Sequence, residues 1–189
     1  MPSYIYINGY PGVGKLTIAN ELLKLIPGSK VLHNHLFIDP VAAMVERSSP
    51  EYDDIRSHLR REILGLLRRP ATRDTTWIFT DSRCTSATGS AAAEDYREAA
   101  AVRGVPFVSV VVDCGLEENQ RRLVREGRGE GKNTKLTDVG ILEAVRREEI
   151  MFRFGGEAEL ELDVSELTPV EAARMILSHV IAVEEKFQN

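Results

Sequence analysis

A glycine-rich run near the start of the chain has the spacing of a phosphate-binding loop. Gly9 and Gly14-Lys15 follow a β-rich run, Tyr4 to Asn8, and precede a helix-forming segment, in the order strand, GxxxxGK, helix. Glycines adopt backbone conformations closed to other residues, so several N–H groups can converge on one anion. The helix adds its free N–H groups and the positive end of its dipole. The alternative interpretation is a glycine turn that binds nothing.

The same run also indicates how a metal ion would be held. The residue after such a lysine is usually Ser or Thr, whose hydroxyl binds Mg²⁺. Here Leu16 occupies that position and has no oxygen to give, while Thr17 follows one place later and can still reach a phosphate or the metal. Lys15 itself would add a positive charge at the β- and γ-phosphates. The predicted nucleotide contacts are Gly9, Pro11, Gly12, Val13, Gly14, Lys15, Leu16 and Thr17.

Composition describes an ordinary globular protein. The 189 residues, 43% of them hydrophobic and 28% charged, fit one domain spanning 1–189. The net charge of −5 argues against nucleic acid or membrane as a partner. Cys84 and Cys114 lie far apart and follow no metal spacing, which favours a reduced, cytoplasmic protein. The chain shows no targeting segment and no apolar run of membrane-spanning length. We expect a monomer or a homodimer.

Strand-like and helix-like segments alternate along the whole chain. This alternation predicts an α/β fold with a doubly wound, five-stranded parallel sheet. The dipeptide Asp39-Pro40 predicts an N-cap with proline at the first helical position, and the alternative is a carboxylate that faces the binding cleft. The predicted strands are 3–8, 30–33, 75–80, 107–112 and 159–164, and the predicted helices are 15–26, 40–46, 53–69, 89–103, 116–126, 137–152 and a last helix from 169.

Polar residues follow the predicted strands, at the sheet edge where ligands bind in such folds. Asp81 comes directly after the third strand, where an acidic residue would hold Mg²⁺ or its water shell. The alternative for Asp81 is a helix cap or a turn residue. We therefore predict Asp81 and Thr17 as the metal-binding residues, with Asp81 also catalytic.

The second strand ends in His33-Asn34-His35, which suits an acceptor hydroxyl. A neutral histidine could take its proton as a general base, and His35 is the catalytic candidate. The alternative is a hydrogen-bonded histidine that ties down the loop after the strand. The predicted substrate-binding residues are His33, Asn34, His35, Asp39 and Arg83.

Arginines cluster before a glycine-rich stretch in the second half of the chain. Arg121, Arg122, Arg125 and Arg128 precede or alternate with the glycines at 127, 129 and 131. A phosphate lid needs a hinged loop that carries guanidinium groups, so we predict a lid at about 125–137. Arg125 and Arg128 are its predicted catalytic residues. Arg125 is also predicted to bind the nucleotide, and Lys135 could assist. The alternative is a solvated face that pairs with Glu117, Glu118 and Glu126.

With these residues in place, the chain resembles the P-loop small-molecule kinases, including shikimate kinase, gluconate kinase, chloramphenicol phosphotransferase and the adenylate-kinase-like group. The run INGxPGVGKLT followed by HNH more closely resembles a set of small AAA-type ATP-binding proteins. The resemblance implies the sheet order 2-3-1-4-5, with ATP and Mg²⁺ as cofactors. It also implies that adenine binds between the lid-helix arginines and the loop after strand five, where Ser165 lies. The acceptor would bind near strands two and three. Shikimate- and chloramphenicol-type kinases carry an Asp where this chain has His33-Asn34-His35, and the glycine run after strand three of shikimate kinase is absent. Neither acceptor is therefore assigned.

Three functions follow from these features. The first is an ATP-dependent phosphotransferase that moves the γ-phosphoryl group to a hydroxyl of a small molecule. The second is a P-loop ATPase or nucleotide-binding regulator whose state a partner reads, which the missing hydroxyl at Leu16 favours. The third is a nucleic-acid end kinase, which the net charge disfavours.

Overall fold

A computed structural model of the protein describes residues 1–125 and 135–188, so Arg128 and the lid glycines lie outside the described part. The strands are β1 Tyr4–Asn8, β2 Lys30–His33, β3 Trp77–Thr80, β4 Phe107–Asp113 and β5 Glu159–Asp163. The helices are α1 Lys15–Leu25, α2 His35–Ala42, α3 Tyr52–Leu66, α4 Ala87–Arg103, α5 Leu116–Leu123, α6 Val139–Glu148 and α7 Pro169–Gln188.

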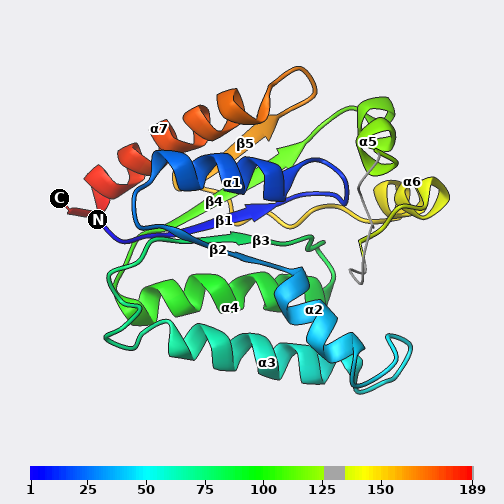
Figure 1. Ribbon diagram of the computed structural model, residues 1–189, viewed down its shortest axis with the longest axis horizontal. Coiled ribbons are helices and arrows are strands. Elements are labelled where there is room, and N and C mark those ends of the chain that lie inside the picture. Colours follow the sequence, from blue (N-terminus) through cyan, green and yellow to red (C-terminus); the bar gives the residue numbers. More distant parts are fainter. Residues whose placement is uncertain (126–134, 189) are drawn as a thin grey trace.

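The strands form one parallel sheet in the order β2-β3-β1-β4-β5, which confirms the predicted fold class and strand order. β1 lies at the centre and pairs with β3 on one side and β4 on the other. All strands point the same way, so their carboxyl ends meet at one edge of the sheet (Figure 1). The loop between β1 and α1 leaves the middle of that edge.

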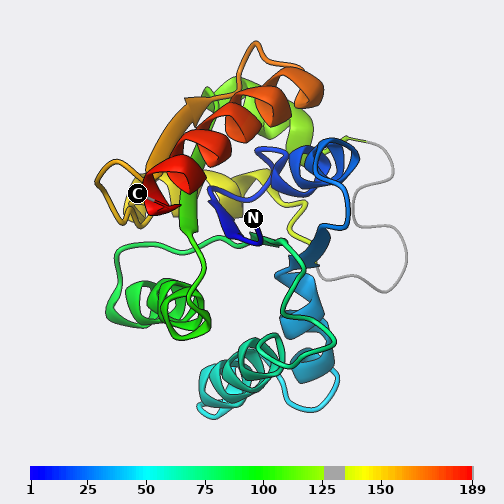
Figure 2. The same ribbon diagram turned by 90° about the vertical axis from the view of Figure 1, so that its left-hand side faces the viewer.

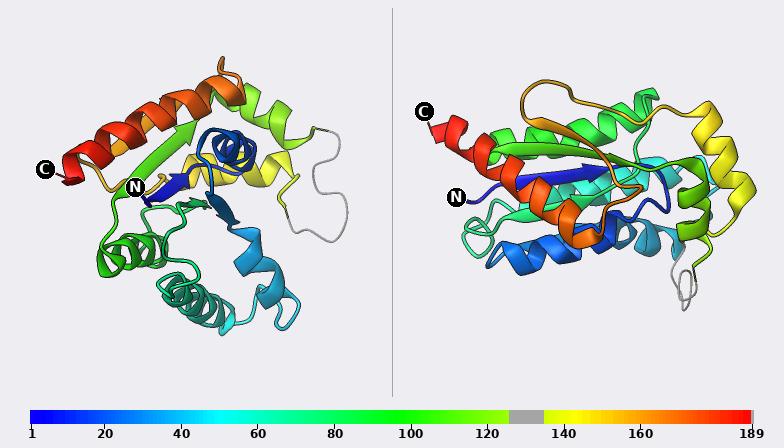
Figure 3. Two further views of the ribbon diagram at one scale, coloured as in Figure 1. Left: turned by 60° about the vertical axis from the view of Figure 1, so that its left-hand side comes forward. Right: turned by 90° about the horizontal axis from the view of Figure 1, so that it is seen from above.

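Helices cover both faces of the sheet. Helices α1 and α7 pack against each other on one face, and α3 and α4 lie on the other (Figures 1 and 2). Helices α5 and α6 lie together beyond the carboxyl ends of the strands, and α2 follows β2 at that same end (Figure 3). No helix in residues 1–125 or 135–188 is long and apolar enough to cross a membrane.

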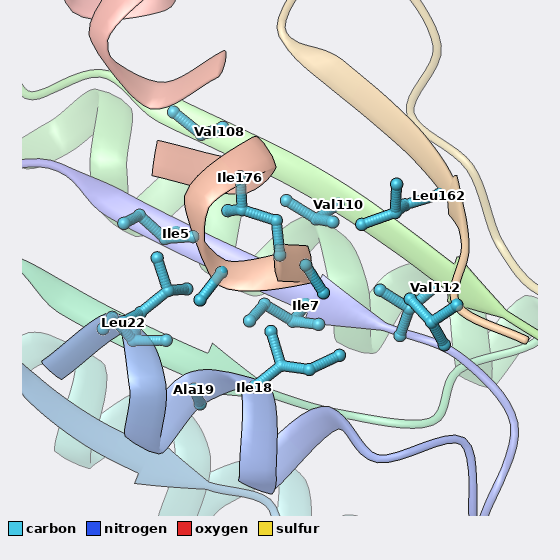
Figure 4. Packing of buried hydrophobic residues seen from close by; sticks show 14 of the residues in the cluster. Ile5, Ile7, Ile18, Ala19, Leu22, Val108, Val110, Val112, Leu162 and Ile176 are labelled. Carbon is cyan, nitrogen blue, oxygen red and sulfur yellow. The ribbon is translucent and has the colours of Figure 1, made fainter. Parts of the chain in front are cut away.

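The central strand is buried on both faces. Ile5 and Ile7 face α1 and α7, where Ile18 of α1 and Ile176 of α7 enclose them (Figure 4). The alternate residues Tyr4 and Tyr6 pack into an aromatic cluster on the other face, with Phe79 of β3 and Tyr96 of α4. This burial fixes the position of β1, and therefore the position from which the loop after it departs.

Several predicted helix ends agree with the structure. The last helix begins at Pro169 as predicted, and Thr168 and Glu171 form a capping box in which the backbone N of Thr168 donates to Glu171 Oε2 at 2.8 Å. Asp138 caps α6 through the backbone N of Ile141, and Gly104 ends α4 in the left-handed conformation. Helices α5 and α6 end earlier than predicted, at Leu123 and Glu148.

The predicted helix 40–46 with Asp39 as its N-cap is wrong. Helix α2 begins at His35, immediately after β2, and the backbone N–H groups of Phe37 and Ile38 both donate to the carbonyl oxygen of Asn34. Asp39 and Pro40 therefore lie inside the helix. Pro40 has no N–H to donate to the carbonyl oxygen of Leu36, so α2 lacks that bond, and the helix ends at Ala42.

Candidate functional site

A cavity of about 380 Å³ opens at the carboxyl edge of the sheet, between the loop after β1 and the ends of β2 and β3. We call residues 9–15 the phosphate loop. One wall is this loop with the first turns of α1, through Pro11, Gly12, Gly14, Lys15, Leu16, Thr17 and Asn20. The opposite wall comes from the strand ends and α2, through His33, Asn34, His35, Ile38, Thr80, Asp81 and Ser82. Arg47, Lys135 and Leu136 complete the lining. Most of the predicted phosphate contacts and three of the five predicted acceptor contacts, His33, Asn34 and His35, thus line one cavity, whereas Gly9, Val13, Asp39 and Arg83 do not.

The phosphate loop is folded tightly against its neighbours. A Cβ atom on Gly9 would lie 2.2 Å from the carbonyl oxygen of Val112, and one on Gly12 would lie 2.7 Å from Asn119 Nδ2. Gly12 also has φ +92°, a conformation that favours glycine. Lys15 curls over the loop, and its Nζ donates to the carbonyl oxygens of Gly9 and Tyr10 at 2.7 Å each. Loop and lysine therefore enclose one small volume at the start of α1.

Two side chains of α5 hold the backbone of this loop, and sequence reasoning did not foresee either contact. Asn119, fully buried, donates from Nδ2 to the carbonyl oxygen of Pro11 at 2.9 Å. Arg122 donates from Nη1 to Val13 O at 2.9 Å and from Nη2 to Val164 O at 2.7 Å. Arg122, expected in a lid cluster, thus links the phosphate loop to the chain after β5.

Two of the other predicted lid arginines, Arg121 and Arg125, do not line the cavity. Arg121 is exposed and pairs with Glu118 at 2.7 Å, which matches the alternative of a solvated face for that residue. Arg125 is exposed and does not line the cavity, and Arg128 lies outside the described residues. Ser165 does not line the cavity either, and its Oγ donates to Asp163 Oδ1 at 2.6 Å.

Arg146 of α6 forms a third support of the loop, one that no local motif marks. Its Nη1 donates to Asp113 Oδ1 at 2.8 Å and to Asn119 Oδ1 at 2.9 Å. Its guanidinium lies 4.4 Å from the ring centroid of Tyr10, and the Tyr10 hydroxyl donates to Glu149 O at 2.8 Å. Helix α6 is therefore connected to the phosphate loop by both charge and stacking.

Asp81 lines the cavity at the end of β3 and is almost completely buried. Its Oδ1 accepts from the backbone N of Ser82 and its Oδ2 accepts from Arg83 Nε, both at 2.8 Å. Burial raises the pKa of this carboxyl, but the charges of Arg83 and Arg56 and the two hydrogen bonds outweigh burial and lower it. Asp81 is therefore ionised, whereas the Arg83 side chain is used in this pair and does not line the cavity.

Asn8 fixes the chain that follows Asp81. It is fully buried at the end of β1, where its Nδ2 donates to Arg83 O at 2.9 Å and its Oδ1 accepts from the Arg83 backbone N at 2.8 Å. The same Nδ2 donates to Phe152 O at 3.0 Å. The sequence feature that could have pointed to this role is the polar Asn8 at the end of an otherwise apolar strand.

The two histidines line the wall opposite the phosphate loop, with ring centroids 6.4 Å apart. His35 Nδ1 lies 3.4 Å from Asp39 Oδ1, one helical turn along α2. Burial lowers the pKa of both histidines, so both are neutral near pH 7. Asn34 between them accepts from Arg56 Nη2 at 3.0 Å, which orients its amide.

Few protein atoms are placed to ligate a metal directly. The described ranges contain no group of three or more His, Cys, Asp or Glu residues that could hold one. Leu16 lines the cavity where a hydroxyl is usual, and Thr17, exposed in the first turn of α1, is the next oxygen. Asp81 is the carboxylate among the described lining residues, and Thr80 and Ser82 beside it add hydroxyl oxygens.

Solved structures of kinases share this architecture over nearly the whole chain. A gluconokinase from Sinorhizobium meliloti 1021 matches with TM-score 0.69 and 15% identity, covering 99% of this chain and 96% of the other. A sugar kinase from Janibacter sp. HTCC2649 matches with TM-score 0.65 and 17% identity over 99% and 98%. The Mycobacterium tuberculosis APS kinase, in complex with AMPPNP and APS, matches with TM-score 0.62 and 14% identity over 95% and 98%. No family model and no curated protein matches the sequence. The chain has the fold of the P-loop small-molecule kinases.

Proposed function

We propose that the protein is an ATP-dependent phosphotransferase that transfers the γ-phosphoryl group to a hydroxyl of a small molecule. One observation carries the proposal: the phosphate loop with Lys15 and the polar wall with His35 face each other across a single cavity of about 380 Å³. Such a volume suits a small acceptor beside the terminal phosphates. The kinase activities named for the structural neighbours agree with this assignment.

The nucleotide would bind with its phosphates on the backbone N–H groups of the phosphate loop and the first turn of α1. The ammonium of Lys15, which now contacts the Gly9 and Tyr10 carbonyls, would turn to the β- and γ-phosphates. The loop is held by Asn119, Arg122 and Arg146, so little reorganisation is needed when the phosphates arrive. Arg125 and Ser165 remain proposed contacts of the nucleotide, and Arg125 and Arg128 remain proposed catalytic arginines.

In the transfer step, the acceptor oxygen forms a bond to the γ-phosphorus while the bond from that phosphorus to the β–γ bridging oxygen breaks. ADP leaves with the bridging oxygen, and the hydroxyl proton passes to His35. His35 is suited to accept it because burial keeps the imidazole neutral, and the adjacent Asp39 carboxylate stabilises the imidazolium that forms. Positioning and charge neutralisation supply most of the catalysis in this reaction class.

The oxygens near the phosphate loop fit a Mg²⁺ ion that keeps most of its waters. Mg²⁺ is usually bound by one or two carboxylates together with substrate phosphates, so Asp81 and Thr17 would hold it, Asp81 through water. The ion would supply neutralisation of the phosphate charge. Leu16 withholds the hydroxyl ligand found at this position in most phosphate loops.

Leu16 also favours a second candidate function, a nucleotide-binding regulator with slow ATP hydrolysis. A weakly held metal lowers turnover, and both oxygens of Asp81 already accept hydrogen bonds from Ser82 and Arg83. The two functions differ in whether an acceptor accelerates ADP formation.

ADP release across a panel of sugars, nucleosides, hydroxy acids and aminoglycosides separates them. A phosphotransferase gives at least one acceptor that raises the rate well above background, with phosphorylated product detected by mass. Lys15→Ala abolishes this turnover, whereas Lys24→Ala, an exposed lysine paired with Glu21 on α1, leaves it unchanged. Slow hydrolysis that no acceptor accelerates would support the regulator instead.

A further inference from the structure

Positively charged side chains outnumber carboxylates among the described residues that line the cavity. Lys15, Arg47 and Lys135 line the cavity, and Asp81 is the one carboxylate among the described lining residues. The charge of Asp81 is already balanced by Arg83 at 2.8 Å. The whole chain has a net charge of −5, so this excess of cations is local and runs against the protein's overall charge.

Arg47 and Lys135 lie apart from the phosphate loop. Burial lowers the pKa of His35 and Asp39 raises it, and the charges of Lys135 and Arg47 lower it further. Lys135 also lowers the pKa of His33. Lys15 lies at the other end of the cavity, where its Nζ donates to the carbonyl oxygens of Gly9 and Tyr10 at 2.7 Å. The cavity therefore has two cationic ends, one at the phosphate loop and one beside the histidines.

Arg47 is available for a ligand. It is exposed on the connection between α2 and α3, residues 43–51, and forms no ion pair within the described ranges. A guanidinium at a cavity wall that pairs with no carboxylate of the described residues adds nothing to the folding stability of the protein. Its planar N–H donors, however, match the geometry of an oxyanion. His33 adds a second polar group, because its buried Nδ1 has no hydrogen-bond partner in the described part of the chain.

Resting on the proposed phosphotransfer, we propose that the acceptor carries an anionic oxyacid group, a carboxylate or a phosphate, which Arg47 binds with help from Lys135. The anion is held at the rim of the cavity while the acceptor's hydroxyl lies toward His35 and the γ-phosphate. Neutral polyols and nucleosides lack the group that Arg47 recognises and are poor acceptors. Arg47 is a specificity-determining residue that the sequence did not reveal, because the fold of 35–51 brings it to the histidines.

Calorimetry on protein saturated with AMPPNP tests the site, since the analogue occupies the phosphate loop up to the γ position. The probes are inorganic phosphate, glycerate and, as the neutral counterpart, glycerol. We expect phosphate or glycerate to bind and glycerol not to bind. The anion that binds with the higher affinity shows whether the acceptor carries a phosphate or a carboxylate. Arg47→Ala should weaken anion binding about 10- to 100-fold, with Arg47→Lys intermediate. Arg147→Ala, an exposed arginine of α6 paired with Glu148, is the matched control and should bind as the wild type does.

The outcomes separate this inference from the proposed function. Normal AMPPNP affinity without anion binding, or anion binding that Arg47→Ala and Lys135→Ala both leave unchanged, overturns the inference alone. Loss of AMPPNP binding in wild-type protein overturns the proposed function. In that case the same anion titration on Lys15→Ala protein without nucleotide still decides whether Arg47 holds an oxyanion.

Discussion

The Nε atom of Arg83 donates a 2.8 Å hydrogen bond to Oδ2 of Asp81, and the carboxylate that accepts it is fully buried. Breaking a buried pair by removing one partner leaves an uncompensated charge. We expect Arg83→Met to lower the free energy of unfolding by about 3–5 kcal/mol at pH 7, measured by chemical denaturation. Lys186→Met, which removes an exposed pair with Glu157, should have little effect.

The same variant has a defined pH dependence. In the folded protein the pKa of Asp81 is lowered, so the pair stabilises the protein above the ordinary Asp pKa and the stabilisation fades as the pH falls through the lowered value. Removing Arg83 raises the pKa of Asp81. The stability difference between wild type and Arg83→Met should therefore be full at pH 7 and shrink below about pH 4. A pH-independent difference would show that Asp81 is not the charge involved.

We expect the pKa of His35 to set the acid limb of the pH–rate profile. Its pKa is lowered below 6.5 by burial, Asp39 opposes this shift, and Lys135 and Arg47 add to it. Only the neutral imidazole accepts a proton, so kcat should fall as the pH drops through that lowered value and level off above it. His35→Gln should reduce kcat by about 10²–10⁴-fold and remove this limb. His33→Gln is the control and should keep the acid limb of the profile. An unchanged pH–rate profile in His35→Gln would assign the base to another group.

Leu16→Ser restores a hydroxyl at the position next to Lys15. Because this oxygen would be a direct ligand, we expect the ratio of ATP affinities with and without Mg²⁺ to rise by about tenfold. Leu16→Ala removes the same apolar surface without adding oxygen and should leave the ratio unchanged. Equal ratios in both variants would mean that the metal lies out of reach of position 16.

Gly12→Ala tests how closely the phosphate loop must approach α5. The new Cβ would lie 2.7 Å from Asn119 Nδ2 in a backbone with φ +92°, so the variant should lose about 1–3 kcal/mol of stability together with nucleotide affinity. Gly28→Ala has a comparable φ of +75° and no atom within 4 Å of the new Cβ. It should lose stability and keep its affinity for ATP, and loss of affinity in both variants would point to a general effect on folding.

The sheet and the phosphate loop could be predicted because their signals are local. Phosphate binding needs glycines and a lysine at fixed spacing, and the buried strands are short apolar runs. The same local logic failed at Asp39, where a good cap signature lies inside α2 because the chain turns into a helix directly after β2. Local preference was overruled there by the position of the strand end.

The supports of the site could not be predicted. Arg122, Arg146 and Asn8 bind groups far away in the sequence, several of them backbone carbonyls, which every residue carries and no side-chain pattern marks. Arg47 likewise meets the histidines only through the path of α2 and the following connection. Predicting such contacts requires the tertiary arrangement itself.

The central position of β1 sets the order in which the protein can be assembled. β1 pairs with β3 and β4, which lie about 70 and 100 residues further along the chain, and α1 packs against α7 near the opposite end. During synthesis the segment that carries the phosphate loop emerges before β3, β4 and α7, so the elements that it packs against are made only later. We therefore expect folding to be dominated by long-range contacts and slow for its size. Nucleotide binding should appear only once α7 is complete, so ATP can stabilise the finished protein but cannot guide its early folding.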